Sequence, residues 1–194
     1  MKQSKIRKMT VTAILAAASS VLMFISFSVP FMPPFIKMDF SELPALIAAF
    51  ALGPLSGAAV SLVKNLINLP FSTTGGVGEL SNFILCCAFV VPAGIIYKYK
   101  KSRRGAIIGA LTGAAVCAVL SLATNFYIVY PFYTAFMPME NIIAAYKAIN
   151  PRVNSLFEAL LWFNMPFTFA KCMCSVIITV FIYKKLSPVL KGTK

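Results

Sequence analysis

Apolar stretches of about 20 residues recur along this chain, and they constrain its fold more than any other feature. The first extends from Met9 to Val29 without an acidic or basic residue. A helix needs about 20 apolar residues to cross the hydrocarbon core of a bilayer. Only 12% of the chain is charged, about half the share that is usual in soluble domains. We therefore expect an all-α integral membrane protein.

Six helical spans are predicted, in a single transmembrane domain that covers residues 1–194. Proline and glycine breaks separate the apolar stretches and set the expected bounds of the spans. The second span has about thirteen residues, too few to cross a bilayer upright, and is expected inside the bundle. A short amphipathic helix is expected at 139–149, outside the spans. The six ranges are 9–28, 40–52, 55–69, 79–97, 105–127 and 156–186.

The net charge of +13 is interpreted by its position along the chain. Four expected spans separate the first basic cluster from the second, and two separate the second from the third. Because both numbers are even, all three clusters lie on one side of the membrane. The positive-inside rule identifies that side, and with it both termini, as cytoplasmic. No basic segment alternates with exposed aromatic residues, which argues against nucleic-acid binding. The clusters are Lys2, Lys5, Arg7 and Lys8; Lys98, Lys100, Lys101, Arg103 and Arg104; and Lys184, Lys185, Lys191 and Lys194.

Small and sulfur-containing residues also occur within the expected spans. Gly105, Gly109 and Gly113 repeat every fourth residue, which indicates a face that another helix approaches closely. The cysteines are expected to pack inside the bundle. Histidine is absent and no cysteine spacing fits a zinc site, so neither a metal nor a catalytic residue is expected. The cysteines are Cys86, Cys87, Cys117, Cys172 and Cys174.

Polar side chains gather in the outer half of the expected bundle. A charged residue at the bilayer centre costs about 2.5 to 3.5 kcal/mol on insertion scales, so each needs a partner or a function. Asn164, Thr168 and Lys171 are four and three residues apart and therefore share one helical face. The full set is Asp39, Glu42, Lys64, Asn65, Asn68, Glu79, Asn82, Asn125, Asn164, Thr168 and Lys171.

Two explanations of this polar set are open. The groups either pair internally, Lys64 with Glu79 for instance, or line a ligand site. The amides outnumber what a few ion pairs require, which favours a neutral ligand with carbonyls, ring nitrogens and hydroxyls. No arginine lies in the spans, which disfavours a phosphorylated ligand. Nearby aromatic residues would suit a flat aromatic ligand, and they are Phe31, Phe35, Phe40, Tyr127, Tyr130, Trp162 and Phe167.

The chain carries no energy-converting motif of its own. No Gly-x-x-x-x-Gly-Lys-Ser/Thr phosphate loop occurs, and no inverted repeat with paired broken helices is evident. The chain is therefore expected to be non-enzymatic, and energy for any transport would have to come from another protein. A membrane enzyme or assembly factor that uses Asp39 and Glu42 as acid and base is a further alternative, because the two carboxylates lie about one helical turn apart.

Four segments resemble the substrate-binding S component of energy-coupling factor (ECF) transporters, and in particular its riboflavin-specific members. They are Pro-Pro-Phe-Ile-Lys-Met-Asp-Phe-Ser-Glu-Leu-Pro at 33–44, Phe-Ala-Leu-Gly-Pro-Leu-Ser-Gly at 50–57, Lys-Asn-Leu at 64–66 and Pro-Phe-Thr-Phe-Ala-Lys at 166–171. The resemblance implies a six-helix bundle in a bacterial cell membrane that captures riboflavin from outside. It also implies a transmembrane coupling protein of the EcfT type and two cytosolic ATPases of the EcfA type as partners. Riboflavin would be the transported substrate, and no cofactor is expected. The alternative is an S component for another vitamin or for a flavin such as FMN.

The polar set and the resemblance together assign expected roles to residues. The loop 29–38 would act as a lid through Phe31, Pro33, Pro34 and Phe35. Ala13 and Ala17 resemble the family's Ala-x-x-x-Ala contact with the coupling protein, with packing inside the bundle as the alternative. Thr168 stands where the family often has asparagine and lacks the amide. The expected substrate-binding residues are Asp39, Phe40, Glu42, Lys64, Asn125, Asn164, Thr168 and Lys171.

Overall fold

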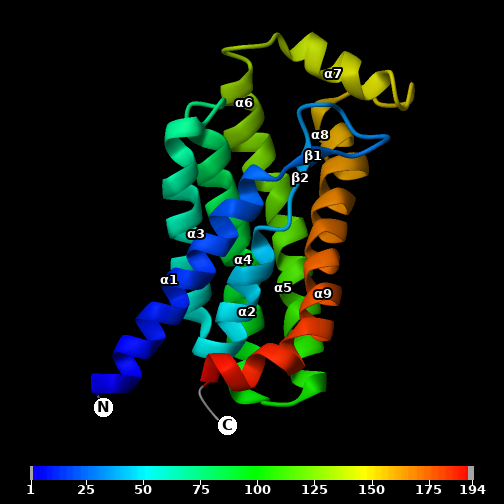
Figure 1. Cartoon of the computed structure of the whole chain (residues 1–194). Helices are drawn as coiled ribbons and strands as arrows, with labels where there is room; N and C mark the ends of the chain where they lie inside the picture. Colours follow the sequence, from blue (N-terminus) through cyan, green and yellow to red (C-terminus); the bar gives the residue numbers. More distant parts are fainter. Residues whose placement is uncertain (1, 192–194) are drawn as a thin grey trace.

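The computed structural model describes Lys2–Lys191, so Lys194 of the third basic cluster lies outside the described residues. The chain forms a bundle of helices packed side by side (Figure 1). Within the described part, four helices are long and apolar enough to cross a membrane. These four helices span Lys5–Phe24, Val77–Tyr99, Arg103–Tyr133 and Leu156–Ile182.

The two ends of the bundle differ in what they carry. The N-terminus, the last turns of α9 and the connection from α4 to α5 lie at one end, called here the terminal end (Figure 1). The short strands, α6 and α7 lie at the opposite end, called here the hairpin end. The elements are α1 Lys2–Phe24, β1 Phe27–Ser28, β2 Lys37–Met38, α2 Glu42–Leu52, α3 Pro54–Asn68, α4 Val77–Tyr99, α5 Arg103–Thr124, α6 Tyr130–Tyr133, α7 Met139–Lys147, α8 Leu156–Ala159 and α9 Met165–Lys191.

Helix α2 is buried inside the bundle, as its length predicts. Its eleven residues would extend only about 16 Å at 1.5 Å per residue. Every residue from Pro44 to Phe50 is buried. Gly53, with a φ of 106°, turns the chain from α2 into α3. A Cβ at Gly57 would lie 2.8 Å from Ala45 O, so α2 and α3 pack almost backbone to backbone.

Helices α4 and α5 pack closely through the predicted glycine face. A Cβ at Gly113 would lie 2.1 Å from Phe89 O, and one at Gly109 would lie 2.8 Å from Ala93 O. Only residues without side chains allow the two backbones to approach this closely.

Helix bounds depart from the expected ranges near the hairpin end. Helix α1 ends at Phe24 because the following residues form β1, where Phe27 pairs with Met38. The fifth helical stretch continues past residue 127 to Tyr133. Pro131 does not break it, because the proline lies just after the π-helix Asn125–Val129, where the regular i to i−4 hydrogen bonds are already interrupted.

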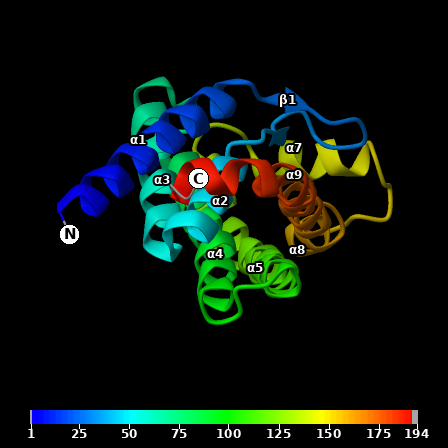
Figure 2. The ribbon, with the colours of Figure 1, turned by 60° about the horizontal axis from the view of Figure 1, so that its bottom comes forward.

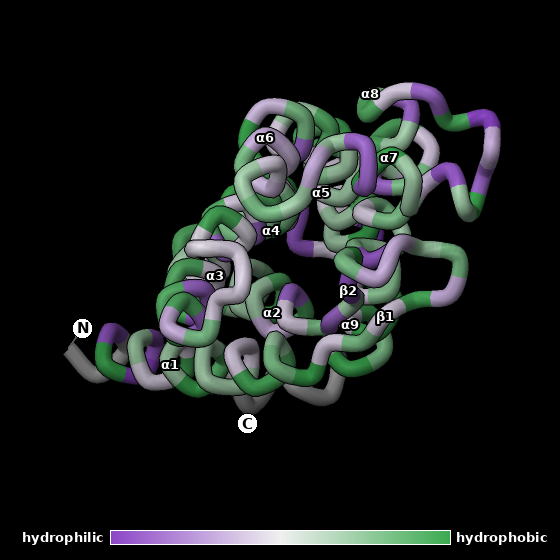
Figure 3. The backbone as a smooth tube through the Cα atoms, turned by 90° about the horizontal axis from the view of Figure 1, so that it is seen from above, coloured by the Kyte–Doolittle hydropathy of each residue, from purple (hydrophilic) through white to green (hydrophobic). Residues whose placement is uncertain are grey.

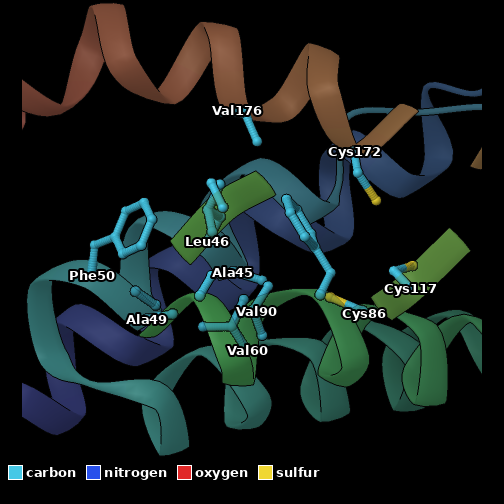
Figure 4. Close-up of a cluster of buried hydrophobic side chains, with 14 of the residues drawn as sticks. Ala45, Leu46, Ala49, Phe50, Val60, Cys86, Val90, Cys117, Cys172 and Val176 are labelled. Carbon is cyan, nitrogen blue, oxygen red and sulfur yellow. The ribbon is translucent and has the colours of Figure 1, made fainter. Parts of the chain in front are cut away.

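Two hydrophobic cores stabilise the bundle. The larger one joins α1, α2, α3, α4, α5 and α9 and includes the thiols of Cys86, Cys117 and Cys172 (Figure 4). These three cysteines are buried, as expected, whereas Cys87 and Cys174 are half-buried; all five are free thiols. The smaller core lies at the hairpin end and is formed by Val129, Tyr130, Ile142, Tyr146, Val153, Ala159 and Leu160.

Candidate functional site

Two buried ammonium groups and two buried carboxylates gather near the start of α2. Lys171 Nζ on α9 lies 3.0 Å from Asp39 Oδ2 and 3.3 Å from Glu42 Oε1. Lys64 of α3 is completely buried. In the view along the bundle, hydrophilic segments lie beside α2, β2 and α9 in the middle of the molecule (Figure 3). Because buried charges are costly unless paired, these four groups hold three elements in one arrangement.

Ser41 connects this charge cluster to α1 and α3. Lys64 Nζ donates a hydrogen bond to Ser41 Oγ at 2.6 Å, and Ser41 N donates to Asp39 Oδ1 at 2.8 Å. Ser19 Oγ on α1 donates to Ser41 O. Asp39 lies in the loop before α2. Burial alone would raise its pKa, but Lys171, Lys64 and the Ser41 hydrogen bonds together hold that pKa below its ordinary value.

The suggested internal pair of Lys64 with Glu79 is wrong. Lys64 instead donates to Ser41. Glu79 accepts hydrogen bonds from Asn68 Nδ2 at 3.2 Å and from Ser72 Oγ at 2.6 Å. Glu79 therefore stabilises the connection from α3 to α4, because its carboxylate bonds to residues on both sides of the turn.

Two predicted binding residues lie in π-helical turns. Asn125 begins the π-helix Asn125–Val129 in the fifth stretch, and Asn164 ends the π-helix Leu160–Asn164 in the last one. A π turn holds an extra residue and redirects the side chains around it, and such turns are frequent at functional sites. No sequence pattern indicated either turn.

Asn164 is held in a ring of hydrogen bonds with two tyrosines. Tyr146 OH donates to Asn164 Oδ1 at 2.6 Å. Asn164 Nδ2 donates to Tyr130 OH at 3.0 Å, and the two tyrosine hydroxyls bond to each other. Tyr146 was absent from the predicted site. Its one sequence signal is its position four residues after Ile142, on the apolar face of an amphipathic helix.

A cavity of about 170 Å³ opens between the charge cluster and the hairpin end. Five of the eight predicted binding residues line it: Glu42, Asn125, Asn164, Thr168 and Lys171. The other three do not line it. Asp39 pairs with Lys171, and Lys64 donates to Ser41, so both support the cavity from outside its lining. Phe40 packs on Phe27, with ring centroids 6.1 Å apart. The remaining lining residues are Phe35, Ile36, Asn82, Leu85, Val129, Tyr130, Tyr133 and Phe167.

The expected lid residues lie at different depths. Phe35 meets Tyr130 and Tyr146 edge to face, with ring centroids 6.4 and 5.9 Å apart. Pro33 is buried and Pro34 is exposed. Phe31 is 85% exposed and has a φ of 64°. Of the four expected lid residues, Phe35 alone lines the cavity, together with the neighbouring Ile36. Among the other aromatic residues considered, Tyr127 and Trp162 are exposed and lie outside the cavity lining.

A second hollow, of about 540 Å³, lies between α1 and α3. Figure 2 shows α1 along the outside of the bundle beside α3. Ala13 and Ala17 are exposed and line this hollow, whereas Ala16 lines it and is also buried in the larger core. The wall is mostly apolar and consists of Lys8, Met9, Thr12, Ala13, Ala16, Ala17, Leu55, Ser56, Ala59, Val63 and Ile67.

Comparison with known proteins gives consistent matches over nearly the whole chain. Residues 7–183 match the family model described as "ECF transporter, substrate-specific component". The chain is 32% identical to "Riboflavin transporter RibU" of Staphylococcus aureus (strain TCH60), over 98% of this chain and 95% of the relative. It is 30% identical to "Riboflavin transporter FmnP" of Bacillus subtilis (strain 168), over 95% and 94%.

A solved structure has a similar fold. It is described as "Structure and mechanism of the S component of a bacterial ECF transporter". The match has a TM-score of 0.75 and 30% sequence identity, and it covers 97% of this chain and 99% of the other.

Proposed function

This multi-pass membrane protein belongs to the family of substrate-specific components of ECF transporters, and we propose that it binds riboflavin in the 170 Å³ cavity and delivers it into a bacterial cell. The observation that carries this proposal is the lining of the cavity. Amide and hydroxyl groups of Asn125, Asn164 and Thr168 stand beside the aromatic rings of Phe35 and Phe167. A flavin needs both, since its ring system is flat and apolar while its edge and ribityl chain carry hydrogen-bonding groups.

The charge balance of the site favours riboflavin over FMN. Asp39, Glu42, Lys64 and Lys171 contribute two negative and two positive formal charges, and Lys171 is already paired with both carboxylates. No arginine lines the cavity within the described residues. A phosphate would enter without a free cationic partner, and an unpaired buried charge is strongly unfavourable.

The cavity is smaller in this structure than a flavin requires. Its volume of about 170 Å³ lies below the roughly 300 to 1,000 Å³ that is typical of small-molecule sites. A flavin therefore requires Phe35 and Ile36 to move outward with the loop 29–38, which acts as the lid. Phe35 rests edge to face on the rings of Tyr130 and Tyr146, and such contacts break more readily than a buried ion pair.

The terminal end is proposed to face the cytoplasm, with six helices of a single domain crossing or entering the bilayer. The hollow lined by Ala13 and Ala17 would receive an apolar helix of an EcfT-type coupling protein. Two EcfA-type ATPases would supply the energy, and the whole bundle would reorient to release its cargo. No resident cofactor takes part.

Fluorescence titration tests the proposal, because a flavin loses fluorescence when it stacks on protein aromatic rings. The purified protein is expected to quench riboflavin with high affinity and to bind FMN at least 10-fold more weakly. Asn125→Ala is expected to weaken binding, whereas Asn141→Ala, which removes an exposed amide on α7, leaves it unchanged. Absence of quenching contradicts the function, and equal affinity for FMN contradicts the charge argument.

A further inference from the structure

Tyr146 lies outside the cavity lining and yet is the largest fully buried side chain among the described residues. It belongs to α7, a nine-residue helix outside the four candidate membrane spans. Figure 1 shows α7 across the hairpin end, beyond the top of the bundle. Its hydroxyl group reaches Asn164, which is 7% exposed and lines the cavity.

The three hydrogen bonds of the ring have one consistent direction. Tyr146 has a single hydroxyl proton, which it donates to Asn164 Oδ1. Tyr130 must then donate to Tyr146, because their hydroxyls bond to each other, and Tyr130 accepts from Asn164 Nδ2. Each tyrosine therefore donates once and accepts once.

This direction fixes the amide of Asn164. Oδ1 is held toward Tyr146 and Nδ2 toward Tyr130, so the amide plane can neither flip nor rotate without breaking two buried hydrogen bonds. One N–H and one lone pair of Oδ1 remain for a ligand in the cavity. An amide that is already oriented loses less entropy when it binds a ligand.

We propose that Tyr146 is a positioning residue that orients Asn164 for the substrate, so that α7 forms part of the binding site without touching the ligand. The inference rests on the proposed function and deepens it. Phe35 packs against both tyrosines of the ring, so closure of the lid and orientation of the amide share the same two side chains.

Tyr146→Phe tests the inference because it removes one hydroxyl and keeps the ring that packs on Phe35 and Phe163. Riboflavin affinity is expected to fall about 10-fold, mainly through faster dissociation, since a buried acceptor on Asn164 loses its partner. Tyr127→Phe is the matched control. It removes the hydroxyl of a residue that is 75% exposed and should change affinity less than about twofold.

A double variant separates positioning from a general loss of structure. If Tyr146 acts through Asn164, adding Tyr146→Phe to Asn164→Ala changes affinity less than about twofold. The inference is overturned if the losses of affinity in the two single variants multiply in the double variant. It is also overturned if Tyr146→Phe binds riboflavin like the wild type.

A wild-type protein that fails to bind riboflavin contradicts the proposed function instead, and the inference is then decided without ligand. In protein labelled with ¹⁵N-asparagine in detergent micelles, the side-chain amide signals of Asn164 are those lost in Asn164→Ala. Their hydrogen exchange is expected to be about 10-fold faster in Tyr146→Phe and unchanged in Tyr127→Phe. Equal exchange in the wild type and Tyr146→Phe overturns the inference.

Discussion

Lys171 Nζ lies 3.0 Å from Asp39 Oδ2, although 132 residues separate them in the chain. This ion pair ties the second turn of α9 to the loop that follows the β-hairpin. Both side chains are about one-tenth exposed, so neither charge has water to solvate it if the other is removed. The pair therefore holds Lys171, which lines the 170 Å³ cavity, in a fixed position.

Lys171→Met is predicted to destabilise the protein by about 3 to 5 kcal/mol, because it removes the ion-pair partner of both buried carboxylates, Asp39 and Glu42, and leaves Lys64 as the remaining cation of the cluster. Thermal unfolding in detergent measures the change, with Lys147→Met on the exposed side of α7 as the control. The double variant Lys171→Met with Asp39→Asn should recover part of the lost stability but not riboflavin binding. A single variant that unfolds at the wild-type temperature would contradict the role of the pair.

Phe35→Ala is predicted to raise the dissociation rate of riboflavin about 10-fold. The substitution removes two edge-to-face contacts, each of about 0.5 to 1.5 kcal/mol, that hold the lid closed. Stopped-flow fluorescence measures the rate. Phe31→Ala, at the exposed tip of the same loop, should leave it unchanged. A larger effect at Phe31 than at Phe35 would show that a different residue closes the cavity.

Ala17→Leu is predicted to abolish riboflavin uptake while leaving riboflavin binding intact, because the larger side chain projects into the hollow between α1 and α3 and obstructs the proposed helix of the coupling protein. Uptake by cells and binding by purified protein are measured in parallel, together with co-purification of the coupling protein. Ala18→Leu changes an exposed α1 residue outside the hollow and should preserve both. Equal loss of uptake and binding would mean that Ala17 supports the fold rather than an interface.

Gly113→Ala is predicted to destabilise the bundle by about 1 to 3 kcal/mol, since the new methyl group would meet Phe89 O at 2.1 Å and force α4 and α5 apart. Thermal unfolding again provides the measurement. Ala115→Val adds a larger volume at an exposed position two residues further on and should be nearly neutral. If the two variants are equally stable, α4 and α5 are packed less closely than described.

The sequence predicts the helices better than the connections between them. Each expected range contains a helix, and the buried position of α2 followed from its length and apolar character. Periodicity is the physical reason, because helical spacing is visible over a dozen residues. The two-residue strands Phe27–Ser28 and Lys37–Met38 are too short to produce a pattern.

The site was predictable in part for the same reason. Polar residues are easily recognised within apolar spans, and six members of the polar set line one cavity. The hydrogen-bonding partners of these residues cannot be recognised in the same way. Lys64 bonds to Ser41 rather than to Glu79, and nothing in the sequence distinguishes the two acceptors. Tyr146 was missed because a tyrosine on an amphipathic helix looks like any other packing residue until its hydroxyl is seen to reach Asn164.

The balance of formal charge among Asp39, Glu42, Lys64 and Lys171 has an electrical consequence. Moving one elementary charge through a membrane potential of about 100 mV involves about 2.3 kcal/mol. A bundle that reorients with an uncharged vitamin moves no net charge from this cluster through the field. The resting potential then neither drives nor opposes uptake, and the import of riboflavin should be insensitive to ionophores that collapse the potential while ATP is maintained.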